Sequence, residues 1–279
     1  MSNSQESAIQ VVATYGHGTQ NDFLILFDEN DAYSISPAQI AAMCDRNSGI
    51  GADGFIRIVK RDGKWFMDYS NADGSVAEMC GNGIRVMARY LVTHNHQPEG
   101  IFAINTRAGI KHLRVPREGD ISVNMGQVTD EMEEVHVSHN GLSLTGYNIS
   151  VGNPHAVVFV DSVDQVGSLD IAPTVTPTSS YPEGVNVEFV EITGPSVAKM
   201  RVHERGSGET KSCGTGTCAV ALAATLKSGQ RLPAQWTIYP PGGTLIVDID
   251  GHSNATLIGP AILLADHDIS GYLNSVQAK

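Results

Sequence analysis

Two cysteines stand at the start of nearly identical glycine-rich turns, and they are the residues best suited to carry chemistry. The turns read C-G-N-G at Cys80–Gly83 and C-G-T-G at Cys213–Gly216. Each turn precedes apolar residues at helical spacing, so each cysteine is expected at a helix N-terminus. The unpaired N–H groups there favour a bound carboxylate or phosphate and give a thiol thiolate character.

Two such turns that face each other could invert a carbon centre next to a carboxylate. One thiolate would take a proton from one face and the opposite thiol would return one to the other face, with no cofactor and no metal. Cys44 and Cys218 are interpreted instead as buried packing residues. The four cysteines lack the C-x-x-C pairing of a zinc site and are too few for a disulfide framework.

Polar residues recur at matched distances from the two cysteines. Asn21 lies 59 residues before the first cysteine, and Asn153 lies 60 residues before the second. Asn71 and Glu204 each lie nine residues before their own cysteine. These offsets predict an internal duplication of a module of roughly 130 residues.

The chain is long enough for two domains, and we expect an α+β fold with two pseudo-symmetric domains. The predicted domains are 1–128, joined by 265–279, and 129–264. Helices are expected at Ser36–Asp45, Cys80–His94 and Cys213–Leu226. Strands are expected at Ile9–Tyr15, Phe23–Phe27, Gly54–Val59, Trp65–Ser70, Ile121–Met125, Leu142–Val151, Ala156–Val160, Val185–Ile192, Val197–Val202 and Leu245–Ile249. The stretch Ala172–Pro182 is interpreted as a surface loop.

Composition narrows the classes of partner. The net charge of −12 disfavours phosphate backbones and anionic lipid, so neither nucleic acid nor a membrane is expected as a partner. The N-terminus has no basic and apolar regions of a signal peptide, and no stretch reaches the roughly 18 apolar residues of a membrane span. A cytoplasmic location is expected, where thiols stay reduced.

Several segments resemble the diaminopimelate epimerase family over about residues 12–260. The segments are HGTQNDF (17–23), GIGADG (49–54), YSNADGSVAEMCGNGIR (69–85), VGNPHAV (151–157), GVNVEFV (184–190) and RVHERGSGETKSCGTGTCA (201–219). The resemblance implies two β-rich rolls, each wrapped around a central helix, with the site between them. It implies an isomerase that interconverts LL- and meso-2,6-diaminopimelate for lysine and peptidoglycan precursors, without a cofactor and as a homodimer.

The resemblance also implies roles for individual residues. Cys80 would be the proton donor and Cys213 the acceptor for the LL substrate, with His155 and Glu204 beside the reacting amine. Backbone amides of Gly81, Asn82, Gly214 and Thr215 would hold the α-carboxylate. The distal end of the substrate would be surrounded by Asn21, Asn71, Asn153, Asn186 and Arg205, whose guanidinium suits a carboxylate.

Two positions depart from the family pattern. Gln20 replaces a common glycine, and Gly54 stands where many members have a glutamine, so no substrate contact is assigned to position 54.

Four alternatives remain. A proline or hydroxyproline racemase would carry C-G-H-G where this chain has Asn82, and a PhzF-like isomerase lacks the two cysteines. A phosphate-binding protein would need the Lys and Ser/Thr of a G-x-x-x-x-G-K-[ST] loop. A thiol redox protein would use a disulfide between Cys80 and Cys213.

Overall fold

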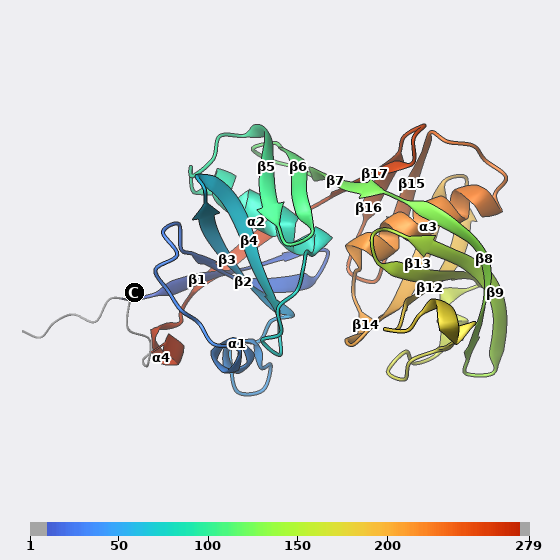
Figure 1. The fold of residues 1–279 in the computed structure, drawn as a ribbon, viewed down its shortest axis with the longest axis horizontal. Helices are drawn as coiled ribbons and strands as arrows, with labels where there is room; N and C mark the ends of the chain where they lie inside the picture. The colour runs from blue at the N-terminus through green and yellow to red at the C-terminus, as the bar shows by residue number, and fades with distance from the viewer. Residues whose placement is uncertain (1–9, 274–279) are drawn as a thin grey trace, which may run out of the picture.

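Two lobes lie side by side, and each consists of strands around one long helix (Figure 1). The computed structural model describes residues 10–273. The N-terminal lobe has strands β1 (Val12–Gly18), β2 (Asn21–Phe27), β3 (Gly54–Arg61), β4 (Lys64–Asn71), β5 (Gly100–Thr106), β6 (Gly109–Val115), β7 (Ile121–Gln127) and β18 (Ile262–Asp268), and helices α1 (Pro37–Cys44), α2 (Gly81–Thr93) and α4 (Ser270–Leu273).

The C-terminal lobe follows the same plan. Its strands are β8 (Thr129–His139), β9 (Leu142–Ser150), β10 (Pro154–Phe159), β11 (Thr174–Thr176), β12 (Asn186–Gly194), β13 (Val197–Glu204), β14 (Gly208–Thr210), β15 (Ala234–Tyr239), β16 (Leu245–Ile249) and β17 (Asn254–Gly259). Its helices are α3 (Gly214–Lys227) and two 3₁₀ turns, η1 (Val163–Val166) and η2 (Thr178–Ser180).

Strand pairing repeats between the lobes. The N-terminal lobe pairs β18, β1, β2, β3, β4, β5, β6 and β7 in that order, with β2–β3 and β4–β5 parallel. The C-terminal lobe pairs β8, β9, β10, β12, β13, β15, β16 and β17, with β10–β12 and β13–β15 parallel. Equivalent strands therefore occupy equivalent places, as the predicted duplication requires.

Each repeated half of the chain contributes its last strand to the opposite lobe. The chain leaves β7 for β8 of the C-terminal lobe and leaves β17 for β18 of the N-terminal lobe, and β7 pairs antiparallel with β17 where they cross (Figure 1). β18 begins at Ile262, three residues before the predicted return at 265. The two connections hold the lobes to each other through backbone hydrogen bonds as well as packing.

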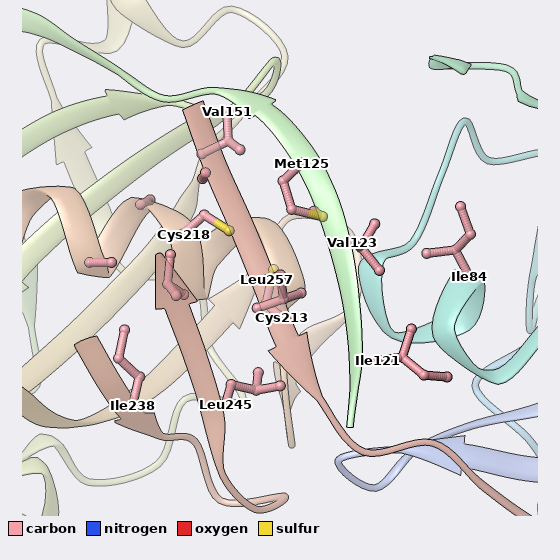
Figure 2. Close-up of a cluster of buried hydrophobic side chains, with 14 of the residues drawn as sticks. Ile84, Ile121, Val123, Met125, Val151, Cys213, Cys218, Ile238, Leu245 and Leu257 are labelled. Carbon is pink, nitrogen blue, oxygen red and sulfur yellow. The ribbon is translucent and has the colours of Figure 1, made fainter. Parts of the chain in front are cut away.

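Alternating side chains of the buried strands supply three cores, one around α2 and α3 and one on the other face of the strands in each lobe. In β2, Phe23 and Ile25 pack with the α2 side, whereas Leu24 and Leu26 pack toward α1. Successive strand residues point to opposite faces, so a strand covered on both faces is a continuous apolar run. The core around α2 and α3 is continuous between the lobes. Figure 2 shows Val123 of β7 and Leu257 of β17 between the two helices.

All three predicted helices are confirmed to within two residues at their ends. Ser36 caps α1 in a capping box with Gln39. The expected strands are present too, except that Ile9 lies outside the described residues. The interpretation of Ala172–Pro182 as a loop is wrong in part, because β11 pairs with β8 there and Tyr181 is buried.

Candidate active site

A cleft of about 1330 Å³ lies between the lobes, and both cysteines line it. All of the predicted site residues except His155 line it as well: Asn21, Asn71, Gly81, Asn82, Asn153, Asn186, Glu204, Arg205, Gly214 and Thr215. The sequence therefore predicted a set of residues that the fold brings to one cavity, although they come from both lobes.

The two glycine turns meet at this cleft. Cys80 is the N-cap of α2 and Cys213 is the N-cap of α3. A Cβ atom placed on Gly214 would lie 3.1 Å from the Cα atom of Gly81 and 3.2 Å from Leu257 Cδ2. The helix starts can approach this closely only because neither glycine has a side chain. Two positive helix ends consequently face one space.

Cys80 is held between a backbone donor and an amide acceptor. Its Sγ atom accepts from the Gly83 N–H at 3.5 Å and donates to Asn21 Oδ1 at 3.4 Å. Burial raises the pKa of the Cys80 thiol to about 11, although the Gly83 bond and the nearby Arg85 oppose the increase. The expected thiolate character of Cys80 is therefore wrong in this structure, because loss of hydration outweighs the helix-end donors.

Cys213 is 6% exposed and has a similar capping bond, from the Gly216 N–H at 3.3 Å. Its Sγ atom also lies 3.5 Å from Thr215 Oγ1. Burial raises the pKa of the Cys213 thiol well above its usual value, and the carboxylates of Glu204 and Glu188 add to that increase. The expectation of thiolate character is wrong here for the same reason.

Asn82 joins the two lobes through its side chain. Its Nδ2 donates to the Ser212 carbonyl at 2.9 Å and to Asn21 Oδ1 at 3.2 Å, and its Oδ1 accepts from Arg85 at 2.9 Å. The residue is fully buried. The side chain thus positions the turns, and only the backbone amide of Asn82 remains for the predicted carboxylate contact.

The orientation of Asn21 is fixed from its other end. Asn21 Nδ2 donates to Asp53 Oδ2 at 2.8 Å, so Oδ1 is the atom that faces the thiol. Asp53 in turn accepts from Arg46 at 2.7 Å, and Arg46 also holds Asp22. Sequence inspection missed this support for Asn21, although Asp53 stands in the quoted GIGADG segment.

His155 lies behind the cleft wall rather than beside it. It is fully buried, with Nδ1 2.6 Å from Glu188 Oε1 and Nε2 3.2 Å from Asn153 Oδ1. His155 was expected beside the reacting amine, but here it contacts Glu188 and Asn153 and does not line the cleft. Its partner Glu188 was missed, although it stands in the quoted GVNVEFV segment, because only Asn186 of that segment was assigned a role.

Glu204 lines the cleft close to Cys213. Burial raises the pKa of its carboxyl, while hydrogen bonds with Thr210 and Cys213 oppose the increase. Arg205 stands at the cleft with its side chain 40% exposed, and its backbone N–H donates to Asn186 Oδ1 at 2.9 Å. Asn186 therefore anchors the backbone of Arg205 as well as lining the cleft.

The structure explains the departure at Gly54, and at position 20 it shows why glycine is common in the family. A Cβ atom at Gly54 would lie 2.7 Å from Tyr69 Cε2, so Tyr69 fills the space that a longer residue would need. Gln20 has φ 59°, in the left-handed region that favours glycine.

Known proteins match this chain along most of its length. A family model described as diaminopimelate epimerase matches residues 13–130 and 147–264. The chain belongs to this family. It is 44% identical over 280 residues to the diaminopimelate epimerase of Streptomyces coelicolor, which covers 94% of this chain and 97% of the relative. The family member from Thermobifida fusca is 41% identical and covers 91% and 96%. The family prediction is confirmed.

Solved structures share the fold at low sequence identity. A Bacillus anthracis phenazine biosynthesis protein of the PhzF family superposes with a TM-score of 0.70 at 14% identity, covering 94% of this chain and 99% of the other. A hydroxyproline epimerase from Agrobacterium vitis gives 0.68 at 13% identity, covering 92% of each. The predicted fold of two similar domains rich in strands is confirmed.

Within residues 10–273, no three His, Cys, Asp or Glu side chains are grouped to hold a metal ion. No helix of that range combines the length and apolar character needed to cross a membrane.

Proposed function

We propose that the chain is an isomerase that interconverts LL- and meso-2,6-diaminopimelate with Cys80 and Cys213 as the two acid/base groups. One observation carries the proposal: two cysteines cap two helices whose first glycines meet at a single cleft. The family membership supplies the substrate class. The same reaction would place the enzyme in the formation of lysine and peptidoglycan precursors.

Proton transfer would take place between the helix ends. The α-carboxylate would accept hydrogen bonds from the N–H groups of Gly81, Asn82, Gly214 and Thr215, and these donors would stabilise the charge that grows on the carboxylate as the α-proton leaves. For the LL substrate the thiolate of Cys213 would accept the proton, and Cys80 would donate its own to the opposite face. Burial raises the pKa of both thiols, so the thiolate of Cys213, once it forms, is a strong base.

The polar cleft residues would bind the rest of the substrate. Arg205 would bind the distal carboxylate through its guanidinium. The side chains of Asn71 and Asn186 would offer amide acceptors to the distal ammonium, while Asn21 and Asn153 would lie nearer the cysteines. Glu204 would stand close to the reacting amine, and His155 would act through Asn153 instead of touching the substrate.

Epimerisation can be tested against the nearest rival. The reduced protein is incubated with LL-diaminopimelate in D₂O, and both product formation and deuterium at one α-carbon are followed. Proline and 4-hydroxyproline serve as matched substrates in parallel samples. The proposal predicts exchange on diaminopimelate only. Exchange on proline without exchange on diaminopimelate would support a racemase of cyclic amino acids instead.

We further propose a cytoplasmic homodimer and the domain limits given above. A reducing compartment would keep both thiols free. β18, which pairs with β1, exposes Leu264 at 59% and Ile262 at 43%, and such apolar side chains are suited to a subunit contact. Light scattering during gel filtration would report the mass directly, and a monomer at micromolar concentration would contradict the dimer.

A further inference from the structure

A buried carboxylate to which the sequence analysis assigned no role lies behind Cys213. Glu188 of β12 is fully buried, and its Oε1 lies 2.6 Å from His155 Nδ1. Its Oε2 has no hydrogen-bond partner among the described residues. A Cβ atom on Gly216, in the first turn of α3, would lie 2.6 Å from Oε1, so the carboxylate is pressed against that turn.

A chain of polar atoms leads from Glu188 to the sulfur. His155 Nε2 lies 3.2 Å from Asn153 Oδ1, Asn153 Nδ2 donates to Thr215 Oγ1 at 3.4 Å, and Thr215 Oγ1 lies 3.5 Å from Cys213 Sγ. Because Thr215 accepts from Asn153, its own hydroxyl proton is available for the sulfur.

The donor and acceptor roles along this series of hydrogen bonds depend on which atoms of the buried Glu188–His155 pair carry protons. Nε2 can contact a carbonyl oxygen at this distance only if it carries a proton. Nδ1 and Glu188 Oε1 then share a second proton, which makes the pair neutral in total. A neutral pair is the form that complete burial favours, because an isolated buried charge is costly.

The N-terminal lobe has neither member of the pair. Strand register places Phe23 where the other lobe has His155, and Ile56 where it has Glu188. The Cδ1 atom of Ile56 lies 3.0 Å from a Cβ placed on Gly83, the counterpart of the Gly216 contact. The lobes therefore share the backbone plan but differ at this pair.

The two sulfurs differ in one side-chain partner, although Cys213 also shares a hydrogen bond with the Glu204 carboxyl. Cys80 donates to the fixed oxygen of Asn21, an arrangement that favours the thiol. Cys213 faces a hydroxyl that can donate, an arrangement that favours the thiolate.

We infer that Glu188 is a positioning residue for Cys213: together with His155 it orients Asn153 so that the Thr215 hydroxyl donates to the Cys213 sulfur. The inference rests on the proposed function for its catalytic meaning. It makes Cys213 the sulfur prepared to carry negative charge when the α-proton is taken.

Other charged groups face the same sulfur and define the competing explanation. Glu204 comes from β13 and Glu188 from β12, and both oppose ionisation of Cys213, while His155 lies behind them on β10 and Cys80 lines the same cleft. If Glu188 acted only as a negative charge, its neutralisation would make the thiolate easier to form. If Glu188 acts through the series of hydrogen bonds, removing its charge alone would change little. Losing its hydrogen bond with His155 would then make the Cys213 thiolate harder to form.

The test measures thiolate formation at each cysteine without substrate. Iodoacetamide alkylation of Cys80 and Cys213 is followed by mass spectrometry between pH 6 and 10 in the reduced full-length protein. Thr215→Val removes the hydroxyl and Thr215→Ser keeps it. Glu188→Ile copies the residue of the other lobe, whereas Glu188→Gln can still donate to His155 Nδ1.

We expect Thr215→Val and Glu188→Ile each to slow Cys213 alkylation at pH 8 about tenfold, by raising its pKa about one unit, with Cys80 unchanged. Thr215→Ser and Glu188→Gln should stay within about threefold of the parent. In the epimerase assay, kcat should fall with Thr215→Val while KM holds, because the backbone N–H is retained.

Two results would overturn the inference. Unchanged Cys213 alkylation in Thr215→Val, where the fold is least disturbed, would show that the hydroxyl does not stabilise the thiolate. Faster alkylation of Cys213 in Glu188→Gln would show that Glu188 acts only through its negative charge, which opposes ionisation of the thiol. Alkylation needs no diaminopimelate, so failure of the proposed reaction would be seen separately, as absent turnover in the parent protein.

Discussion

Gly214→Ala should disturb both the junction of the lobes and catalysis. The added Cβ would lie 3.1 Å from Gly81 Cα and 3.2 Å from Leu257 Cδ2. The leucine side chain can rotate away, but the Gly81 Cα belongs to the opposite helix start. Because carbon atoms prefer roughly 3.5–4.0 Å, the two turns must separate by about 0.5 Å.

The expected size follows from that displacement. A misplacement of about 1 Å can lower a rate roughly 100-fold, so half of that corresponds to about tenfold in kcat. Overpacking of this kind destabilises by about 1–3 kcal/mol, while replacing a helical glycine by alanine returns up to about 1 kcal/mol. We therefore expect a small net loss of stability together with a clear loss of turnover.

The assay compares kcat for LL-diaminopimelate with the urea midpoint of unfolding. Gly251→Ala is the matched control, because a Cβ there meets nothing within 4 Å and the backbone does not have the positive φ that favours glycine. Turnover of Gly214→Ala within twofold of the control would refute the close approach of the two turns as a requirement for catalysis.

Two further predictions concern stability. Asn82→Ala should destabilise the fold by about 1–3 kcal/mol in urea unfolding, because the Ser212 carbonyl and Arg85 lose a buried partner; an unchanged midpoint would contradict the bridging role. Burial alone would raise the pKa of Asp68, but hydrogen bonds from Arg57 and Arg107 lower it overall. Its contribution is therefore present above about pH 4 and lost as pH falls through the lower folded pKa, so Asp68→Asn should flatten the acid side of the stability curve, measured by thermal unfolding from pH 2 to 7. The exposed Asp161→Asn is the control, and equal acid sensitivity of both variants would contradict this.

Local patterns predicted the catalytic scaffold well. The glycine turns marked both helix starts, and the matched spacing of Asn21 and Asn153 indicated the duplication that strand pairing then showed. These signals are readable because they depend on neighbours within one turn or on comparison of the chain with itself.

Features that depend on strand register were missed. The pair of Glu188 with His155 arises because β10 and β12 lie parallel and turn both side chains toward α3. The pairing of β7 with β17 between the lobes has no local signal either, because it depends on strands about 130 residues apart in the sequence. Burial of the thiols also follows only from the assembled cleft, so their raised pKa could not be predicted from the helix ends alone.

The most direct test of the two-cysteine account is early deuterium labelling. LL-diaminopimelate is converted in D₂O to a few per cent, and the isotope content of product and remaining substrate is measured. Two bases on opposite faces predict deuterium in nearly all of the meso product and almost none in the remaining LL substrate, with no product from Cys80→Ala or Cys213→Ala. Equal early labelling of substrate and product, or near-parental turnover in either variant, would contradict the account.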